Sequence, residues 1–131
     1  MDVMIVEDER IISLAVSRMV EGLGHRVLAT IPSAEEALER LELLRPDLVL
    51  MDIHLQGPMD GIDACVAIHE RWDIPCVYTS AYTDEATKVR ASATKPLAFL
   101  GKPLSISSFT EIFEKIKAIN PRSRGGGCLM A

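Results

Sequence analysis

Five polar residues in this sequence follow short apolar runs, at the points where those runs end: Glu7 and Asp8 after residues 3–6, Asp52 at the end of 47–52, Ser80 after 74–79, and Lys102 shortly after 97–100. A carboxylate beside apolar side chains costs free energy unless it lies near solvent or near opposite charge. Their shared placement at run ends suggests that these polar residues act together.

Three of the five are carboxylates, and they would repel one another if they lay close together. A single lysine does not neutralise them, so we expect them to recruit a hard divalent cation. Mg²⁺ suits a few oxygen ligands and several retained waters. The backbone carbonyl of His54, in the loop after Asp52, is the further ligand we expect. Alone, Glu7 and Asp8 could equally mark a helix N-terminus, where acids complement the helix dipole.

The same set of residues suits phosphoryl transfer. The oxygens of an arriving phosphoryl group would be matched by Mg²⁺, the Lys102 ammonium and the Ser80 hydroxyl, and catalysis of this reaction is mostly positioning and charge stabilisation. Asp52 would be the nucleophile and would form an acyl phosphate. Taken singly, Ser80 would usually be a turn or cap residue.

Five short apolar runs predict the strands that position these residues: 3–6, 25–31, 47–52, 74–79 and 97–100. They are uniformly apolar, so we expect strands buried on both faces. Amphipathic helical stretches separate them, and strict alternation implies right-handed crossovers and a parallel sheet covered on both sides. Ligands bind such sheets at the carboxyl ends of the strands, where we expect Asp52 to be exposed.

The helical stretches differ in strength. The first covers residues 12–23, the second follows a capping box that begins at Ser33, and the last has Ser105 or Ser108 as its cap. The fourth, residues 83–94, has an apolar face of only small residues and Val89, so its packing should be weak. An element held this loosely could move.

The composition limits the classes of protein to which this chain can belong. The chain has 131 residues, 48% of them hydrophobic and 25% charged, as in an ordinary single globular domain. No apolar run approaches the roughly 20 residues that span a bilayer and no signal peptide is visible, so we expect a cytoplasmic protein without membrane contact. A net charge of −5 gives no general footprint for nucleic acid. Cys65 and Cys76 read as small core residues.

Five motifs carry a resemblance to a known family: VEDE (6–9), LVLMDIHL (48–55), MDGID (59–63), YTSAYTD (78–84) and FLGKP (99–103). In this order and spacing the chain resembles a receiver domain of the two-component response regulators, of the single-domain chemotaxis type. The resemblance covers residues 1–119, and it implies a doubly wound α/β fold, flavodoxin-like, with a five-stranded parallel sheet in the order 2-1-3-4-5. Residues 120–131 read as a flexible tail.

The resemblance also implies roles for single residues. Asp52 would accept a phosphoryl group from a histidine kinase or a phosphotransfer protein. Asp8 would bind Mg²⁺ directly and Glu7 through water. Lys102 would contact the phosphate and be joined to the following proline by a cis peptide.

The switch implied by the resemblance uses Ser80, which turns inward on phosphorylation, and Phe99, which stands where the family more often has tyrosine. The face formed by 83–94, 97–100 and the last helix would then bind a downstream partner or a second copy. His54 and Tyr82 stand where the family tunes dephosphorylation. The chain would catalyse only its own phosphorylation and dephosphorylation, and would not contact nucleic acid directly.

Two other functions remain open at this point. An aspartate-nucleophile, Mg²⁺-dependent phosphatase of the haloacid-dehalogenase type would use a similar strand-end acid and lysine. Such enzymes typically place a second acid two residues after the nucleophile, where this chain has His54. A receiver-like module that signals without phosphorylation is the other alternative, but Asp8, Asp52, Ser80 and Lys102 are all present.

Overall fold

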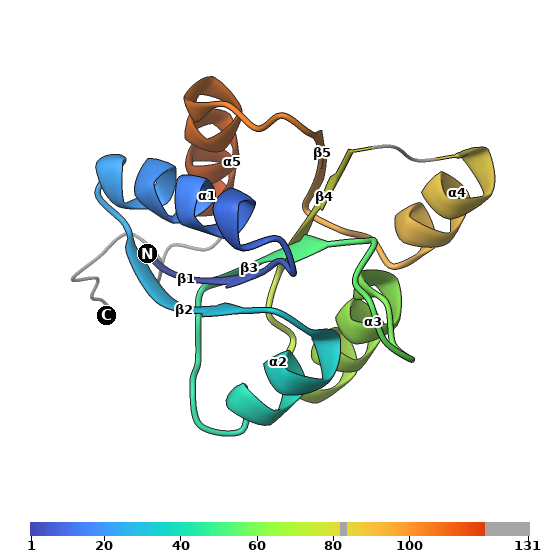
Figure 1. The fold of residues 1–131 in the computed structure, drawn as a ribbon. Helices are drawn as coiled ribbons and strands as arrows, with labels where there is room; N and C mark the ends of the chain where they lie inside the picture. The colour runs from blue at the N-terminus through green and yellow to red at the C-terminus, as the bar shows by residue number, and fades with distance from the viewer. Residues whose placement is uncertain (82–83, 120–131) are drawn as a thin grey trace.

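The computed structural model describes residues 1–81 and 84–119 and contains one five-stranded parallel sheet in the order β2-β1-β3-β4-β5 (Figure 1). The strands are β1 (Asp2–Val6), β2 (Arg26–Ile31), β3 (Leu48–Asp52), β4 (Cys76–Ser80) and β5 (Ala98–Gly101). The helices are α1 (Arg10–Gly22), α2 (Ala34–Arg40), α3 (Gly61–Trp72), α4 (Glu85–Ala93) and α5 (Ile106–Ile119). The expected fold class and strand order are confirmed.

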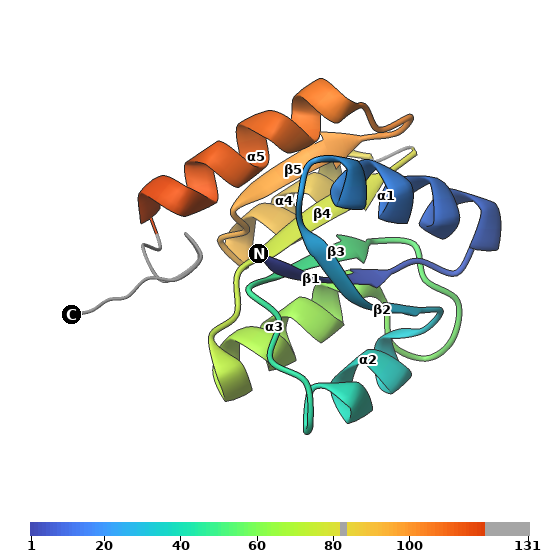
Figure 2. The same cartoon turned by 90° about the vertical axis from the view of Figure 1, so that its left-hand side faces the viewer.

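The sheet separates two hydrophobic clusters. Helices α1 and α5 cover one face, and α2 and α3 cover the other (Figures 1 and 2). Because successive side chains of a strand point to opposite faces, Val3 and Ile5 join the cluster under α1 and α5, whereas Met4 and Val6 join the cluster under α2 and α3. Ala91 is the point at which α4 joins the second cluster.

The expectation that all five strands are buried on both faces is wrong for the two edge strands. Every residue of β3 and β4 is buried, but β5 is partly exposed along its length and β2 buries only Ile31. An edge strand has a neighbouring strand on one side only, so the helices cover it less completely. Apolar composition alone does not distinguish an edge strand from a central one.

Helix ends agree with the sequence where a serine caps them. Ser33 Oγ accepts a hydrogen bond from the Glu36 amide at 3.2 Å and caps α2. Of the two candidates for α5, Ser105 is the cap, because its Oγ accepts from the Ser108 amide at 3.3 Å. A full capping box at α3, formed by Asp60 and Asp63, was not predicted.

Helix α4 is as weakly packed as expected, but its predicted apolar face is wrong. Ala86, Val89 and Ala93 are exposed, and the buried residue of α4 is Ala91. Helical periodicity identifies a stripe of apolar residues but not whether a neighbouring element covers it.

Cys65 and Cys76 are buried and free, as expected. Within the described ranges, no helix combines the length and the apolar character needed to cross a membrane. Tyr82 and the predicted tail at 120–131 lie outside the described residues.

Candidate functional site

Asp52 ends the central strand β3, between β1 and β4, and it is buried, with 3% of its surface exposed. The expectation that it lies exposed at the edge of the sheet is therefore wrong. A carboxylate in this position needs compensating charge or hydrogen bonds, since burial disfavours its ionised form. Both are present: the His54 amide donates to Asp52 Oδ1 at 3.2 Å, and Lys102 Nζ lies 3.6 Å from Asp52 Oδ2.

Glu7 and Asp8, which follow β1, complete an acidic cluster with Asp52. One carboxylate oxygen from each of the three residues lies within 4.8 Å of the others. Hydrogen bonds fix both the backbone and the side chain of Glu7: its amide donates to the Ile31 carbonyl at 2.9 Å, and its Oε2 accepts from the Glu9 amide at 3.0 Å. The convergence of these acids, predicted from their positions at strand ends, is confirmed.

Lys102 lies between two of the acids. Its Nζ is 2.7 Å from Glu7 Oε1, closer than to Asp52, and its side chain is only 10% exposed. The backbone fixes it too, since the Lys102 amide donates to the Ser80 carbonyl at 2.8 Å and the bond to Pro103 is cis. The sequence placed Lys102 at this site but did not predict its ion pair with Glu7.

Burial and neighbouring charges act on both Glu7 and Lys102. Burial raises the pKa of Glu7, the negative charge of Asp52 raises it further, and the hydrogen bonds from Lys102 and Glu9 only partly offset them. Burial alone would lower the pKa of Lys102, but its hydrogen bond to Glu7 and the nearby carboxylates outweigh burial, so this pKa is raised. Three carboxylates against one ammonium leave the site electronegative.

The two residues expected to act as a switch lie on the neighbouring strands. Ser80 ends β4, is buried, and is in register with Gly101 of β5. Phe99 of β5 is half-buried, and its ring centroid lies 6.3 Å from that of Tyr78 at an interplanar angle of 59°. Thr79, the residue before Ser80, is in register with Asp52, so Ser80 lies at the same end of the sheet as the acids, and Phe99 lies two residues before Gly101 on the neighbouring strand.

The loop from β3 to α3 is packed closely against the end of β3. A Cβ added to Gly61 would overlap the Asp52 carbonyl oxygen and would lie 2.9 Å from Met51 Cγ. Gly57 has a φ of 109°, which side chains rarely adopt. The Met59 amide donates to Glu35 Oε2 of α2 at 3.0 Å. The contact of Glu35 was not predicted, because nothing local in the sequence indicates a hydrogen bond between residues 24 positions apart.

Oxygen ligands of this kind and number are those that Mg²⁺ prefers. The donor set that the structure brings together comprises the carboxylates of Glu7, Asp8 and Asp52. Among the described residues, the ammonium paired with these acids is that of Lys102, which does not balance three carboxylates, so a divalent cation would improve the electrostatics of the site. The cluster at the carboxyl ends of β1 and β3 thus has the composition of a magnesium site, and it includes the buried carboxylate of Asp52.

Comparison with known proteins gives a consistent result. The family model described as "Response regulator receiver domain" matches residues 3–114. The transcriptional regulatory protein PdtaR of Mycobacterium tuberculosis is 34% identical over 112 residues, which are 86% of this chain and 54% of that protein. The positive alginate biosynthesis regulatory protein of Pseudomonas aeruginosa is 35% identical over 92% of this chain and 48% of its own length. The chain spans about half the length of these two relatives.

Solved structures show the same fold. The signal receiver domain of a modulated diguanylate cyclase from Desulfovibrio desulfuricans superposes with a TM-score of 0.86 at 28% identity, covering 94% of this chain and 98% of that one. A CheY-like receiver domain protein from Methanospirillum hungatei superposes with a TM-score of 0.82 at 24% identity, over 92% of this chain and 97% of that one, and supports the fold alone. The chain belongs to the response regulator receiver domain family and is a module of phosphorylation-regulated signalling.

Proposed function

We propose that Asp52 is the phosphoacceptor and that it receives its phosphoryl group from a phosphohistidine of a histidine kinase or phosphotransfer protein. A carboxylate oxygen of Asp52 attacks phosphorus, the P–N bond breaks, and its electron pair stays with the imidazole of the donor, which then takes up a proton. The observation that carries the proposal is the position of Asp52: buried at the end of the central strand, 3.6 Å from Lys102 and beside two further acids.

Glu7, Asp8 and Asp52, with the backbone carbonyl of His54, would hold Mg²⁺. The cation supplies positive charge for the phosphoryl oxygens, which repel an approaching carboxylate. Lys102 has a second role, because its ammonium lies between Glu7 and Asp52 and can contact a phosphoryl oxygen once Asp52 is phosphorylated. In this proposal the Ser80 hydroxyl turns toward the same group and becomes its third partner.

The output surface is the face formed by α4, β5 and α5. Phosphorylation would draw Ser80 inward, Phe99 would follow, and this face would change shape and bind a downstream protein or a second copy. The weak attachment of α4, which buries only Ala91, supports a change of position at modest cost. We place the protein in the cytoplasm, without direct contact to nucleic acid or membrane and without turnover of external substrates.

A protein donor must cover the carboxyl edge of the sheet to reach Asp52. Beside this edge, α1 and the segment after β5 line an apolar groove that includes Lys102. Ile11 is 84% exposed and Leu14 54% exposed on the same helix. Exposed apolar side chains continuous with a charged site fit a protein partner. We assign this surface to the phosphodonor.

The test is phosphorylation by a small donor. With Mg²⁺ and acetyl phosphate, the wild type should acquire one acid-stable, base-labile phosphoryl group per chain, and Asp52→Asn or EDTA should abolish it. Asp73→Asn is the matched control, because it makes the same chemical change at a side chain that is 91% exposed and remote from the cluster. Rapid turnover of diverse phosphate esters would instead indicate a phosphatase. Absence of an adduct under all conditions would contradict the proposal.

A further inference from the structure

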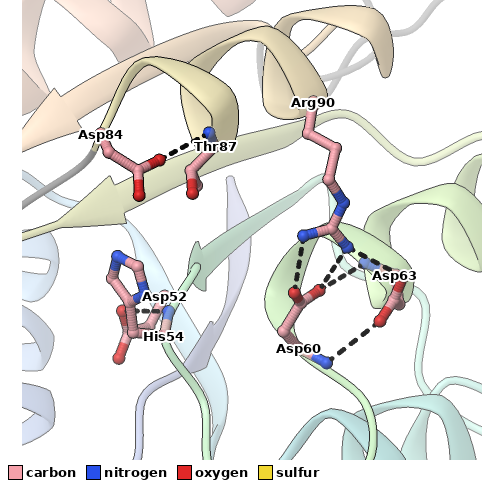
Figure 3. A network of polar contacts seen from close by, with 7 residues as sticks. All are labelled: Asp52, His54, Asp60, Asp63, Asp84, Thr87 and Arg90. Atoms are coloured by element: carbon pink, nitrogen blue, oxygen red, sulfur yellow. Dashed lines mark hydrogen bonds and ion pairs between the residues drawn. The ribbon is translucent and has the colours of Figure 1, made fainter.

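Arg90 of α4 reaches across to the first residues of α3 (Figure 3). Its Nη1 lies 3.0 Å from Asp60 Oδ2, and its Nη2 lies 3.3 Å from Asp60 Oδ1 and 3.1 Å from Asp63 Oδ1. The planar guanidinium thus contacts both carboxylates, two of these bonds forming a fork to Asp60. Burial alone would raise the pKa of Asp60, but the contacts with Arg90 and with the Asp63 backbone outweigh it, so this pKa is lowered.

The two acids bound by Arg90 also determine how α3 begins. Asp60 Oδ1 accepts from the Asp63 amide at 2.9 Å, and Asp63 Oδ2 accepts from the Asp60 amide at 3.4 Å, which forms the capping box. Between them lies Gly61, whose amide donates to the Ile53 carbonyl at 3.0 Å and whose Cα packs against the Asp52 backbone. Arg90 therefore contacts the segment that packs directly on the phosphoacceptor end of β3.

Helix α4 buries little of its own surface. Ala91 is its buried residue, Val89 is 63% exposed, and a groove lined by Ile62, Val66 and Thr94 remains between α3 and α4. The Tyr78 hydroxyl is 2.7 Å from Thr94 Oγ1 at the end of the helix. Partly exposed ion pairs are individually weak, so Arg90 can bias the position of α4 without locking it.

We propose that Arg90 is a positioning residue that couples α4 to the loop between β3 and α3, so that occupancy of Asp52 and the position of α4 influence each other. This inference rests on the proposed function of Asp52. A phosphoryl group that shifts the loop would displace Asp60 and loosen α4. By thermodynamic reciprocity, a partner that holds α4 in its present position would favour the present loop geometry.

The first part of the test is amide hydrogen exchange of the intact chain without ligand. In Arg90→Ala, the amides of residues 86–93 should exchange faster than in wild type by a factor of about 3 to 10, the size expected for partly exposed ion pairs. Arg90→Lys keeps the charge but loses the fork, so its exchange should be intermediate. Lys88→Ala is the matched control, since it removes one cation from the exposed surface of the same helix.

The second part adds Mg²⁺ and fluoroberyllate as a stand-in for the phosphoryl group. Wild type and Lys88→Ala should show protection around Asp52 together with a change in exchange over 86–93. Arg90→Ala should keep the protection around Asp52 and lose at least half of the change in α4. A merely structural role for Arg90 would alter the unliganded exchange but leave the ligand-induced change intact.

The outcomes separate the two proposals. If Arg90→Ala matches Lys88→Ala in both parts, or if the ligand-induced change in α4 survives undiminished, Arg90 does not couple the two regions. If fluoroberyllate gives no protection around Asp52 in wild type, the proposed function fails and the coupling fails with it. Far-ultraviolet circular dichroism and thermal unfolding establish that each variant is folded before exchange is measured.

Discussion

Gly61 is the residue at which a single added methyl group should affect both stability and phosphorylation. In Gly61→Ala the new Cβ would overlap the Asp52 carbonyl oxygen and would lie 2.9 Å from the Asp52 carbonyl carbon. These neighbours are backbone atoms, so no change of side-chain rotamer relieves the contact. Either the start of α3 or the end of β3 must move, and the second contains the candidate phosphoacceptor.

The expected loss is modest in free energy. Inserting a methyl group into a packed site costs about 1–3 kcal/mol, whereas replacing glycine by alanine restricts the unfolded chain and offsets about 0.4–1 kcal/mol of that cost. A net loss of about 1–2 kcal/mol would lower the melting temperature of a domain of this size by roughly 3–10 °C. Because the crowded backbone atoms belong to Asp52, we expect labelling by acetyl phosphate to slow as well.

Gly22→Ala is the matched control. Gly22 ends α1, and a Cβ added there has no atom within 4 Å. This variant should be as stable as wild type or slightly more stable, and it should be labelled at the wild-type rate. Thermal unfolding and labelling are measured on all three proteins. If Gly61→Ala retained both wild-type stability and the wild-type labelling rate, the close approach of Gly61 to Asp52 would not constrain the site.

Three further variants test other contacts. Tyr78→Phe removes the hydrogen bond to Thr94 and should lower the free energy of unfolding in urea by about 0.5–1.5 kcal/mol; an unchanged value would count against that bond. In Arg90→Ala the deficit in stability should be full at neutral pH and should shrink below about pH 4. The pKa of Asp60 is lowered in the folded protein, because Arg90 outweighs burial. The stabilisation by the ion pair therefore exists above the ordinary aspartate pKa and is lost as the pH falls through the pKa of Asp60 in the folded protein. A loss of stability that is equal at pH 7 and pH 3 in urea titrations would refute this pH dependence. Ile11→Glu should slow transfer from a phosphohistidine protein more than labelling by acetyl phosphate, and equal slowing with both donors would argue against the assigned donor surface.

Much of the architecture could be predicted because local patterns specify it. Alternating apolar runs and helical periods identify the parallel sheet, and the positions of Glu7, Asp8 and Asp52 at strand ends bring three acids to one edge. Ser33 as a cap was recognisable from its neighbours in sequence. Each of these features depends on residues within one element or on a general property of parallel sheets.

What could not be predicted depends on contacts between distant segments. The 2.7 Å pair between Lys102 and Glu7 joins residues 95 positions apart, and its existence depends on how the sheet brings the ends of β1 and β5 together. Asp52 is buried at the end of a strand that lies between β1 and β4, and the close approach of Gly61 to its backbone is a contact that apolar periodicity does not describe. The buried side of α4 was misassigned because the spacing of apolar residues does not show which side of a helix a neighbouring element covers.

The division of the core by the sheet has a consequence for how this protein can diverge. Residues that support α1, such as Val16 and Val20, lie in one cluster, whereas Ala91 of α4 and the α3 residues beneath it lie in the other. Substitutions that are well separated and share no partners usually have additive effects on stability. Under the proposed function, the part of the output face that α4 contributes can therefore diverge separately from the donor surface on α1. Helix α5 shares its cluster with α1, so changes beneath these two helices are expected to affect donor recognition and readout together.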